Sequence, residues 1–311
     1  MIRTNPNVPG GIVWLASYPK SGNTWLRVFL YHVTRMMVGV PLEGNDLHQL
    51  DRSSIYEARL FSLFEQFLGK PVAVSDWREI VPIRPQVHAE IVKRARQMVF
   101  VKTHMGLVRI KDAPTINLGV TLGAIYVVRN PLDVVLSLSD HLGMTLDDAI
   151  TAMCLPGYYA PSGTEEVYEP WASWSENVES WTGKKSPIIH ILRYEDMLAN
   201  PIKAFRSVTN HLGQNPTPEQ VAEAVELSAF SRLSSIEKEA DFRERSSYAE
   251  RFFRVGRAGQ WPDKLSEDQI RRLVEANYRQ MNRFGYLTEE LHRFLPEGVK
   301  ASDLDQLART A

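Results

Sequence analysis

The segment SYPKSGNTWLRVFL at residues 17–30 constrains the fold more than any other part of the chain. It follows the short apolar run IVWLA (12–16), which is typical of a strand buried on both faces. From Thr24 onward, apolar residues recur every three or four positions, which predicts a helix packed on a sheet. A helix N-terminus offers unpaired backbone N–H groups and the positive end of a dipole. The loop before it, with Lys20 in it, is therefore suited to bind a phosphate.

Three further apolar runs alternate with helical patterns along the chain. They are MVFV (98–101), AIYVV (124–128) and PIIHIL (187–192). This alternation predicts the α/β class and a P-loop-like three-layer fold, in which helices flank a central parallel β-sheet. Segments 40–90 and 141–170 look rich in loops, and helices are expected within 265–295. Because no Pro/Gly-rich linker divides residues 1–311, we expect a single domain.

The charge balance and the distribution of apolar residues argue against nucleic acid and membranes as partners. The chain has 36 basic and 37 acidic residues, so no broad electrostatic field favours nucleic acid. No stretch reaches the roughly 18 apolar residues of a membrane span, and the first residues lack an apolar signal-peptide core. We therefore expect no membrane insertion and a cytoplasmic location. The lone Cys154 has no partner for an internal disulfide and is more typical of a core residue than of a nucleophile.

Several common catalytic and nucleotide-binding motifs are absent from the sequence. No GxxxxGK[ST], GxGxxG, HExxH or GxSxG pattern occurs, and the lysine stands before the glycine in Lys20-Ser21-Gly22. The run AIYVV ends in Arg129, where a strand of an ATPase often ends in an acidic magnesium ligand. The pattern favours a phosphate-binding loop that meets its ligand with cations and without a metal.

Two other predicted strands end in residues suited to anion binding or proton transfer. Arg129 is followed eight residues later by Ser137, and a guanidinium fork matches phosphate oxygens. The stretch VFVKTHMG (99–106) places Lys102 and His104 just past a strand. Carboxyl ends of parallel strands are where α/β proteins bind ligands. A histidine there can accept a proton from a hydroxyl near neutral pH, and a nearby lysine can stabilise the developing charge.

These stretches together resemble the cytosolic-type sulfotransferase family, which uses 3'-phosphoadenosine-5'-phosphosulfate (PAPS), and the chain looks like a bacterial-like member of it. YPKSGNTW resembles the family's 5'-phosphosulfate loop, VKTH its catalytic segment and YVVRNPLDVVLS its 3'-phosphate motif. LRYEDMLANP, SAF and FFRVGRAGQW resemble further nucleotide-binding segments. The matches follow the family order from residue 12 to about 261, so the resemblance covers most of the chain.

The resemblance implies sulfuryl transfer from PAPS to a hydroxyl of a small-molecule alcohol or phenol, with 3',5'-adenosine bisphosphate (PAP) as product. His104 would act as general base, Lys20 would stabilise the leaving phosphate, and Lys102 would steady the transferring oxygens. Ser137 would engage Lys20 until the acceptor arrives. The implied cofactor-binding residues are Lys20, Ser21, Gly22, Asn23, Thr24, Trp25, Arg129, Ser137, Tyr194, Ser228, Phe230, Arg254, Gly256 and Arg257. No metal is required.

Two departures from the family pattern qualify this assignment. Asn23 stands where threonine is usual and keeps a side chain that can form hydrogen bonds. Val255 stands where a second cation is usual, so 3'-phosphate binding is either weaker or supplemented by Arg257. Two alternatives stay open, a P-loop small-molecule kinase that uses Mg-ATP and a catalytically inactive nucleotide-binding protein.

The acceptor and the oligomeric state are not determined by the sequence. Segments 40–90 and 141–170 are expected to line the acceptor pocket. Aromatic residues in these segments are equally compatible with an apolar acceptor pocket and with core packing. They are Phe61, Phe64, Phe67, Trp77, Tyr158 and Tyr159. The KxxxTVxxxE dimer segment of many relatives is missing, so a homodimer is possible but not indicated.

Overall fold

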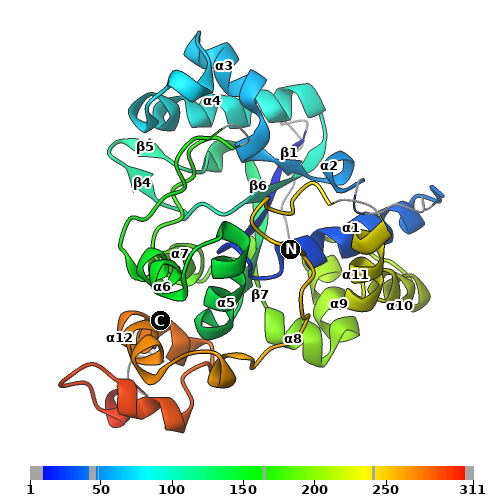
Figure 1. Cartoon of the computed structure of the whole chain (residues 1–311). Helices are drawn as coiled ribbons and strands as arrows, with labels where there is room; N and C mark the ends of the chain where they lie inside the picture. The colour runs from blue at the N-terminus through cyan, green and yellow to red at the C-terminus, as the bar shows by residue number, and fades with distance from the viewer. Residues whose placement is uncertain (1–9, 42–46, 48, 164–165, 240–241, 305–311) are drawn as a thin grey trace.

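The computed structural model describes residues 10–41, 47, 49–163, 166–239 and 242–304. A five-stranded parallel sheet has the strand order β2-β3-β1-β6-β7, and Figure 1 labels its strands β1, β6 and β7. Its strands are β1 (Gly11–Ser17), β2 (Ile55–Tyr56), β3 (Met98–Thr103), β6 (Thr121–Val128) and β7 (Ile189–Arg193). The short strands β4 (Arg109–Ile110) and β5 (Ala113–Pro114) form an antiparallel pair. All four predicted strand runs are confirmed.

Helices occupy much of the remaining chain. The α-helices are α1 (Asn23–Met37), α2 (Leu50–Ser53), α3 (Phe61–Leu68), α4 (Trp77–Ala95), α5 (Pro131–Leu142), α6 (Leu146–Cys154), α7 (Trp174–Thr182), α8 (Tyr194–Ala199), α9 (Pro201–His211), α10 (Pro218–Leu227), α11 (Phe230–Glu239) and α12 (Glu267–Arg283). The 3₁₀ turns are η1 (Glu57–Arg59), η2 (Val72–Val74), η3 (Leu118–Val120), η4 (Trp261–Asp263) and η5 (Glu289–Phe294). None of the helices described here is long and apolar enough to cross a bilayer.

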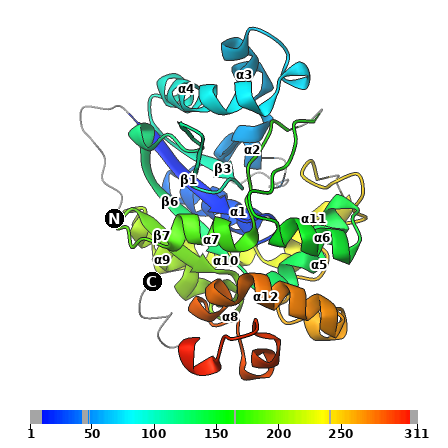
Figure 2. The same cartoon turned by 90° about the vertical axis from the view of Figure 1, so that its left-hand side faces the viewer.

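The central strand β1 is buried on both faces and separates two apolar cores. Ile12, Trp14 and Ala16 face a cluster to which α4, α5, α7 and α12 contribute. Val13 and Leu15 face the opposite cluster, built with α1, α9 and α10. The period of two in a strand assigns alternate residues to opposite faces, and helices cover both (Figure 2). The predicted three-layer α/β fold is confirmed.

The expectation that segments 40–90 and 141–170 are rich in loops is wrong for the first segment and correct for the second, where the described residues from 155 to 173 contain no helix and only an isolated bridge between Ala160 and Glu169. Helices α3 and α4 lie in or begin in the first segment, and α6 lies in the second. Helix α4 starts at a capping box in which Asp76 and Glu79 satisfy each other's backbone N–H groups, and it continues through Pro82 and Pro85. Proline normally interrupts helical hydrogen bonding, so the two prolines hid this helix from the sequence pattern.

The sheet topology brings three loops to one edge. In the parallel register Ala16 lies beside Thr103, and Ser17 lies beside Val127. The carboxyl ends of β1, β3 and β6 are therefore neighbours, although the strands are far apart in sequence. The loops that follow them carry Lys20, His104 and Arg129, and these residues meet at the switch point typical of α/β ligand sites.

Candidate active site

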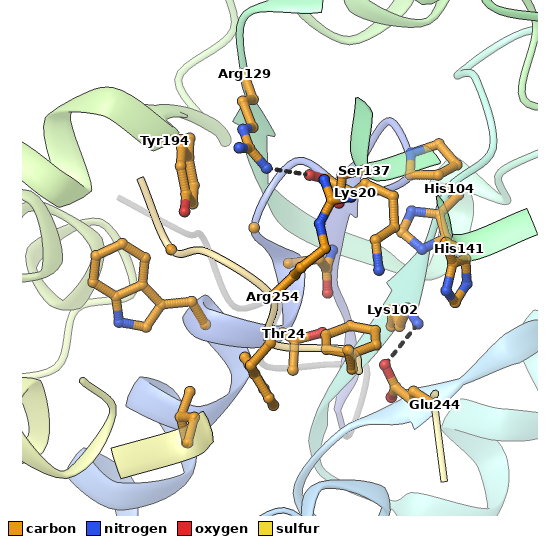
Figure 3. A pocket seen from close by; sticks show the side chains of 18 of the residues that line it. Lys20, Thr24, Lys102, His104, Arg129, Ser137, His141, Tyr194, Glu244 and Arg254 are labelled. Atoms are coloured by element: carbon orange, nitrogen blue, oxygen red, sulfur yellow. Dashed lines mark hydrogen bonds and ion pairs between the residues drawn. The ribbon is translucent and has the colours of Figure 1, made fainter. Parts of the chain in front are cut away.

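A cavity opens at the carboxyl ends of β1, β3 and β6, and Figure 3 shows the labelled side chains converging on it. All of the site residues predicted above line it except Ser21 and Arg257. The Ser21 side chain is fully buried, and Arg257 is exposed. The predicted residues that line the cavity are Lys20, Gly22, Asn23, Thr24, Trp25, Lys102, His104, Arg129, Ser137, Tyr194, Ser228, Phe230, Arg254 and Gly256.

The loop after β1 presents the N-terminus of α1 to this cavity. Gly22 caps the helix with φ of 107° and has no side chain to occupy the first N–H groups, which are left for a ligand. A Cβ atom on Gly22 would lie 2.7 Å from the ring of Tyr194. The Asn23 side chain turns inward and donates to the carbonyl oxygen of Leu15 at 2.8 Å, which ties the helix to β1. The loop is therefore held rigidly, with its backbone exposed to the ligand space.

Two cations in the cavity have no carboxylate partner among the residues that the structure describes. The guanidinium of buried Arg129 donates to the carbonyl oxygen of Lys20 at 3.1 Å and lies 4.3 Å from the ring centroid of Tyr194. Its Nε atom has no hydrogen-bond partner. The ammonium of Lys20 rests 3.8 Å from the ring centroid of Phe252. In the described part of the chain, neither Lys20 nor Arg129 forms an ion pair, so the site attracts an anion.

The surroundings of Lys20 disfavour its charged form. Burial and the nearby charge of Lys102 lower the pKa of Lys20 to about 7. An anion placed beside this ammonium would offset both effects and favour the charged form. The loop lysine is thus matched to a negatively charged ligand.

His104 is held in the tautomer that can accept a proton. Its Nδ1 atom lies 2.9 Å from the carbonyl oxygen of Ser17, so Nδ1–H donates and Nε2 carries the free lone pair. Burial and the charge of Lys102 lower the pKa of His104 to about 3. The ring is therefore neutral near pH 7, and it lines the cavity that contains the two unpaired cations.

Glu169 accepts hydrogen bonds from several groups around His104, and the sequence analysis did not identify it. Its buried carboxylate accepts from the backbone N–H of His104 at 3.0 Å, from Nε1 of Trp171 at 3.0 Å and from the hydroxyl of Tyr56 at 3.2 Å. Tyr56 and Trp171 both line the cavity. The hydroxyl of Thr103 also donates to Glu169, at 3.5 Å. No motif surrounds Glu169 in the sequence, and the fold brings its donors together.

A second carboxylate, Glu244, was also missed. Its Oε2 atom lies 3.1 Å from Nζ of Lys102, and its Oε1 atom pairs with Arg27. His141 lines the same cavity, and burial together with the charges of Lys20 and Lys102 lowers its pKa to about 3. His141 lies near the end of α5, the helix that follows Arg129. This position in the sequence is the signal by which His141 could have been found.

The far end of the cavity is closed by the segment 252–260. Gly256 has φ of 66°, and a Cβ atom there would lie 2.2 Å from the Phe230 ring. The Arg254 guanidinium donates to the carbonyl oxygen of Leu136 at 3.2 Å. Glycine is therefore required at 256, both for the backbone conformation and for the close approach of the ring.

The same segment is fastened to α5. The carboxylate of Asp133 accepts from the backbone N–H groups of Gly259 at 2.7 Å and Gln260 at 2.8 Å. The carbonyl oxygen of Arg257 accepts from Arg129 at 3.4 Å. Since Arg129 also donates to the carbonyl oxygen of Lys20, it links this segment to the loop after β1.

The six aromatic residues considered for the acceptor pocket do not line the cavity. Phe64 is fully buried, and Phe61, Phe67, Trp77 and Tyr158 pack against the core. Tyr159 is 46% exposed. Core packing, the plainer of the two alternatives, accounts for the first five. Segments 40–90 and 141–170 contribute other residues to the cavity, namely Tyr56, Arg59, His141, Leu142, Ala160 and Glu166.

Known proteins resemble the chain along most of its length. A family model described as a sulfotransferase domain matches residues 11–285. Flavonol 3-sulfotransferase of Flaveria bidentis is 21% identical over 284 residues, which cover 84% of this chain and 78% of that protein. Cytosolic sulfotransferase 16 of Arabidopsis thaliana is 25% identical over 295 residues, which cover 85% of this chain and 75% of that protein.

Solved structures share the fold at low sequence identity. A retinol dehydratase in a complex with retinol and PAP has a TM-score of 0.58 at 18% identity, covering 91% of this chain and 83% of that chain. A mouse sulfotransferase complexed with PAP has a TM-score of 0.52 at 19% identity, covering 91% of this chain and 88% of that chain. These likenesses concern the architecture of the backbone.

Proposed function

Because the chain belongs to the sulfotransferase domain family and is a PAPS-dependent sulfotransferase, we propose that it transfers the sulfuryl group of PAPS to a hydroxyl of a small-molecule alcohol or phenol. The observation that carries the proposal is the pairing of two features in one cavity. Lys20 and Arg129 lack a carboxylate partner among the residues described, and His104 offers a free Nε2 beside them. The first feature suits an anionic donor, and the second suits a hydroxyl acceptor.

The residues around the cavity divide between the two ends of the donor. The N–H groups at the start of α1, with Ser21, Gly22, Asn23 and Thr24, would hold the 5'-phosphate and the sulfate. Arg129, Ser137, Arg254 and Gly256 would hold the 3'-phosphate, with Arg257 in support. Trp25, Tyr194, Ser228 and Phe230 would place the nucleoside. The resemblance between the sequence and the family motifs supports these roles, and so does the convergence of these residues, apart from Ser21 and Arg257, on one cavity.

Sulfuryl transfer requires a base that accepts the proton of the hydroxyl and a cation that stabilises the leaving phosphate. PAPS supplies a sulfuryl group bonded through a bridging oxygen to the 5'-phosphate. His104 Nε2 accepts the proton of the acceptor hydroxyl while the bond from that oxygen to sulfur forms. The bond from sulfur to the bridging oxygen breaks, its electron pair stays on the phosphate, and Lys20 stabilises the resulting charge. Lys102 steadies the transferring oxygens.

A kinase that uses Mg-ATP fits the cavity less well. Strand β6 ends at Arg129, and this position offers a cation where a magnesium site needs a carboxylate. An inactive nucleotide-binding protein would not need the proton-free Nε2 of His104. Both alternatives predict no transfer of sulfate, so one assay separates them from the proposal.

We also propose the kind of acceptor, the cellular location and the domain organisation. Solved relatives are complexed with retinol or with androsterone, and we propose an alcohol or phenol of comparable size for this chain. Curated relatives are named cytosolic sulfotransferases, which supports a cytoplasmic location. We further propose that residues 1–311 form one sulfotransferase domain.

The test is a transfer assay with PAPS and a panel of phenols, steroid alcohols and aliphatic alcohols, with PAP formation as the readout. Acceptor-dependent PAP formation without added metal, abolished in His104→Ala, is the expected result. Transfer of phosphate from Mg-ATP to any acceptor would overturn the proposal. Binding of PAP with no transfer across the panel, despite a folded protein, would favour the inactive alternative.

A further inference from the structure

Lys102 is clamped between an aromatic ring and a carboxylate in the cavity wall. It lies near the end of β3 and pairs in register with Tyr56 of β2. Its ammonium lies 3.9 Å from the Tyr56 ring centroid and 3.1 Å from Oε2 of Glu244. The side chains of Lys102 and Glu244 are only 7% and 6% exposed. The dashed line between Lys102 and Glu244 in Figure 3 marks this ion pair.

The other oxygen of the same carboxylate is committed to α1. Oε1 of Glu244 pairs with Nη1 of Arg27, whose side chain is 0% exposed. Nε of Arg27 donates to the hydroxyl of Ser54 at 2.8 Å. Glu244 therefore bridges Arg27 of α1 and Lys102 of β3 and fixes the position of the Lys102 ammonium.

We propose that Glu244 is a positioning residue for sulfuryl transfer, which holds the Lys102 ammonium in its charged form beside His104. The inference rests on the proposed function, because it gives Lys102 its task at the transferring oxygens. Glu244 itself takes no proton and forms no bond to sulfur in this scheme. It acts by geometry, through its 3.1 Å contact with Nζ, and by charge.

Burial makes such a partner necessary. Desolvation lowers the pKa of Lys102, and the charge of Glu244 acts in the opposite direction. For Glu244, burial raises the pKa, but Arg27 and Lys102 together bring it below the usual range, so the carboxylate is ionised. The titratable or charged groups that face Lys102 from the surrounding elements are Arg27, Tyr56, Arg59, Glu166, Glu244, His104, His141 and Lys20. Of the carboxylates in this set, only Glu244 is in ion-pair contact with Lys102 among the described residues.

Glu244 could instead serve only to anchor the segment 242–256, and the structure offers a matched control for that role. Glu237 accepts from the backbone N–H groups of Phe252 at 2.5 Å and Phe253 at 2.9 Å. It therefore anchors the same segment but has no ion pair with Lys102 in the part of the chain described. Comparing Glu244→Gln with Glu237→Gln separates charge from anchoring.

The first experiment measures the protonation of Lys102 in the PAP-free protein. Lysine labelled with ¹³C at Cε and ¹⁵N at Nζ is followed by NMR against pH, and the Lys102 signal is assigned by its loss in Lys102→Arg. In Glu244→Gln the pKa of Lys102 is expected to fall by at least about one unit, a tenfold change in its protonation constant. Glu237→Gln should leave it in place. An unchanged Lys102 pKa in folded Glu244→Gln would overturn the proposal.

The second experiment measures kcat against pH. Loss of the partner charge should move the alkaline limb of the Glu244→Gln profile to lower pH, because Lys102 then loses its proton earlier. PAP affinity should change less than about threefold, since Glu244 has no assigned contact with the nucleotide. If Glu237→Gln moved the limb as far, anchoring would explain the effect and the proposal would fail.

Two further outcomes are distinguishable from failure of the inference: a Glu244→Gln variant that does not fold, and a wild-type protein that transfers no sulfate. Glu244→Asp keeps the charge but shortens the side chain, so it should fold where Glu244→Gln does not and should give a smaller shift in the same direction. No shift in folded Glu244→Asp or Glu244→Gln would contradict the inference. If the wild-type protein transferred no sulfate, the NMR shift would still report the Lys102–Glu244 pair, and only the proposed function would be lost.

Discussion

The Nδ1 atom of His104 lies 2.9 Å from the carbonyl oxygen of Ser17, which ends the neighbouring strand β1. This contact joins two strand ends that are adjacent in the sheet and distant in the sequence. It fixes the Nδ1–H tautomer, so that Nε2 is the atom left to accept a proton. A backbone carbonyl cannot be altered by replacing its side chain, so the tautomer is set by the fold itself.

Replacing His104 should separate chemistry from nucleotide binding. His104→Ala removes the proton acceptor, and kcat should fall by about 10²- to 10⁴-fold, the usual contribution of general base catalysis. PAP affinity should stay within about threefold, because the ring is expected to face the acceptor. Steady-state rates and calorimetric binding of PAP check the two halves. A variant that retained most of its rate would remove the general-base role.

The titration of Lys20 predicts proton uptake when PAP binds. In the free protein, burial and Lys102 lower the pKa of Lys20 to about 7, so part of the population is neutral above that pH. The bisphosphate favours the ammonium and raises this pKa, so affinity is full below about pH 7 and falls as pH rises above it, by up to tenfold per unit. Calorimetry in buffers of different ionisation enthalpy measures the proton uptake. Lys20→Met should abolish it, and uptake that persisted in this variant would assign the proton to another group.

The close approach of Phe230 predicts a specific penalty at Gly256. Gly256→Ala would place a methyl group 2.2 Å from that ring, in addition to the positive φ of 66°. PAP affinity should fall by at least about tenfold, since the strain and the collision each cost on the order of 1–2 kcal/mol. Gly259→Ala is the matched control, because its φ is 73° and a Cβ atom there meets nothing within 4 Å. Equal losses in the two variants would mean that backbone strain alone matters.

The buried carboxylate of Glu169 predicts a stability loss as well as a rate loss. Glu169→Ala leaves the backbone N–H of His104 and Nε1 of Trp171 without their acceptor, at about 1–3 kcal/mol for each buried unsatisfied group, whereas the Tyr56 hydroxyl keeps Glu166. For these two groups, urea unfolding should show a total loss of about 2–6 kcal/mol. Glu166→Gln is the control, because Glu166 also accepts from Tyr56 but is 33% exposed, and its loss should be below about 1 kcal/mol. Equal losses would show that Glu169 does not organise the site.

Local patterns predicted four of the five strands of the sheet, the loop after β1 and the strand-end residues, because each depends on neighbours in the sequence, whereas the two-residue strand β2 (Ile55–Tyr56) was not predicted. The uninterrupted apolar run 12–16 predicted β1, and the spacing of apolar residues after Thr24 predicted α1. The loop with Lys20 and Gly22 lies between these two predicted elements. Helix α4 was not predicted, because Pro82 and Pro85 disfavour a helix locally. Packing of its apolar residues in the core outweighs that local preference.

The carboxylates of the site could not be predicted for a different reason. Glu169 and Glu244 act on residues 65 and 142 positions away, namely His104 and Lys102. Nothing in the surrounding residues distinguishes them from solvent-exposed glutamates. Their roles follow from the packing of loops against the sheet edge, which only a three-dimensional structure supplies.

The most direct test of the account is calorimetric binding of PAP, ATP and 5'-AMP, each with and without Mg²⁺, to the wild-type protein and to Arg129→Gln. We predict tight PAP binding that is independent of Mg²⁺ and at least about tenfold weaker in Arg129→Gln, since a charged hydrogen bond contributes about 1.5–3 kcal/mol. A preference for ATP that depends on Mg²⁺, or PAP binding unaffected by the loss of Arg129, would contradict it.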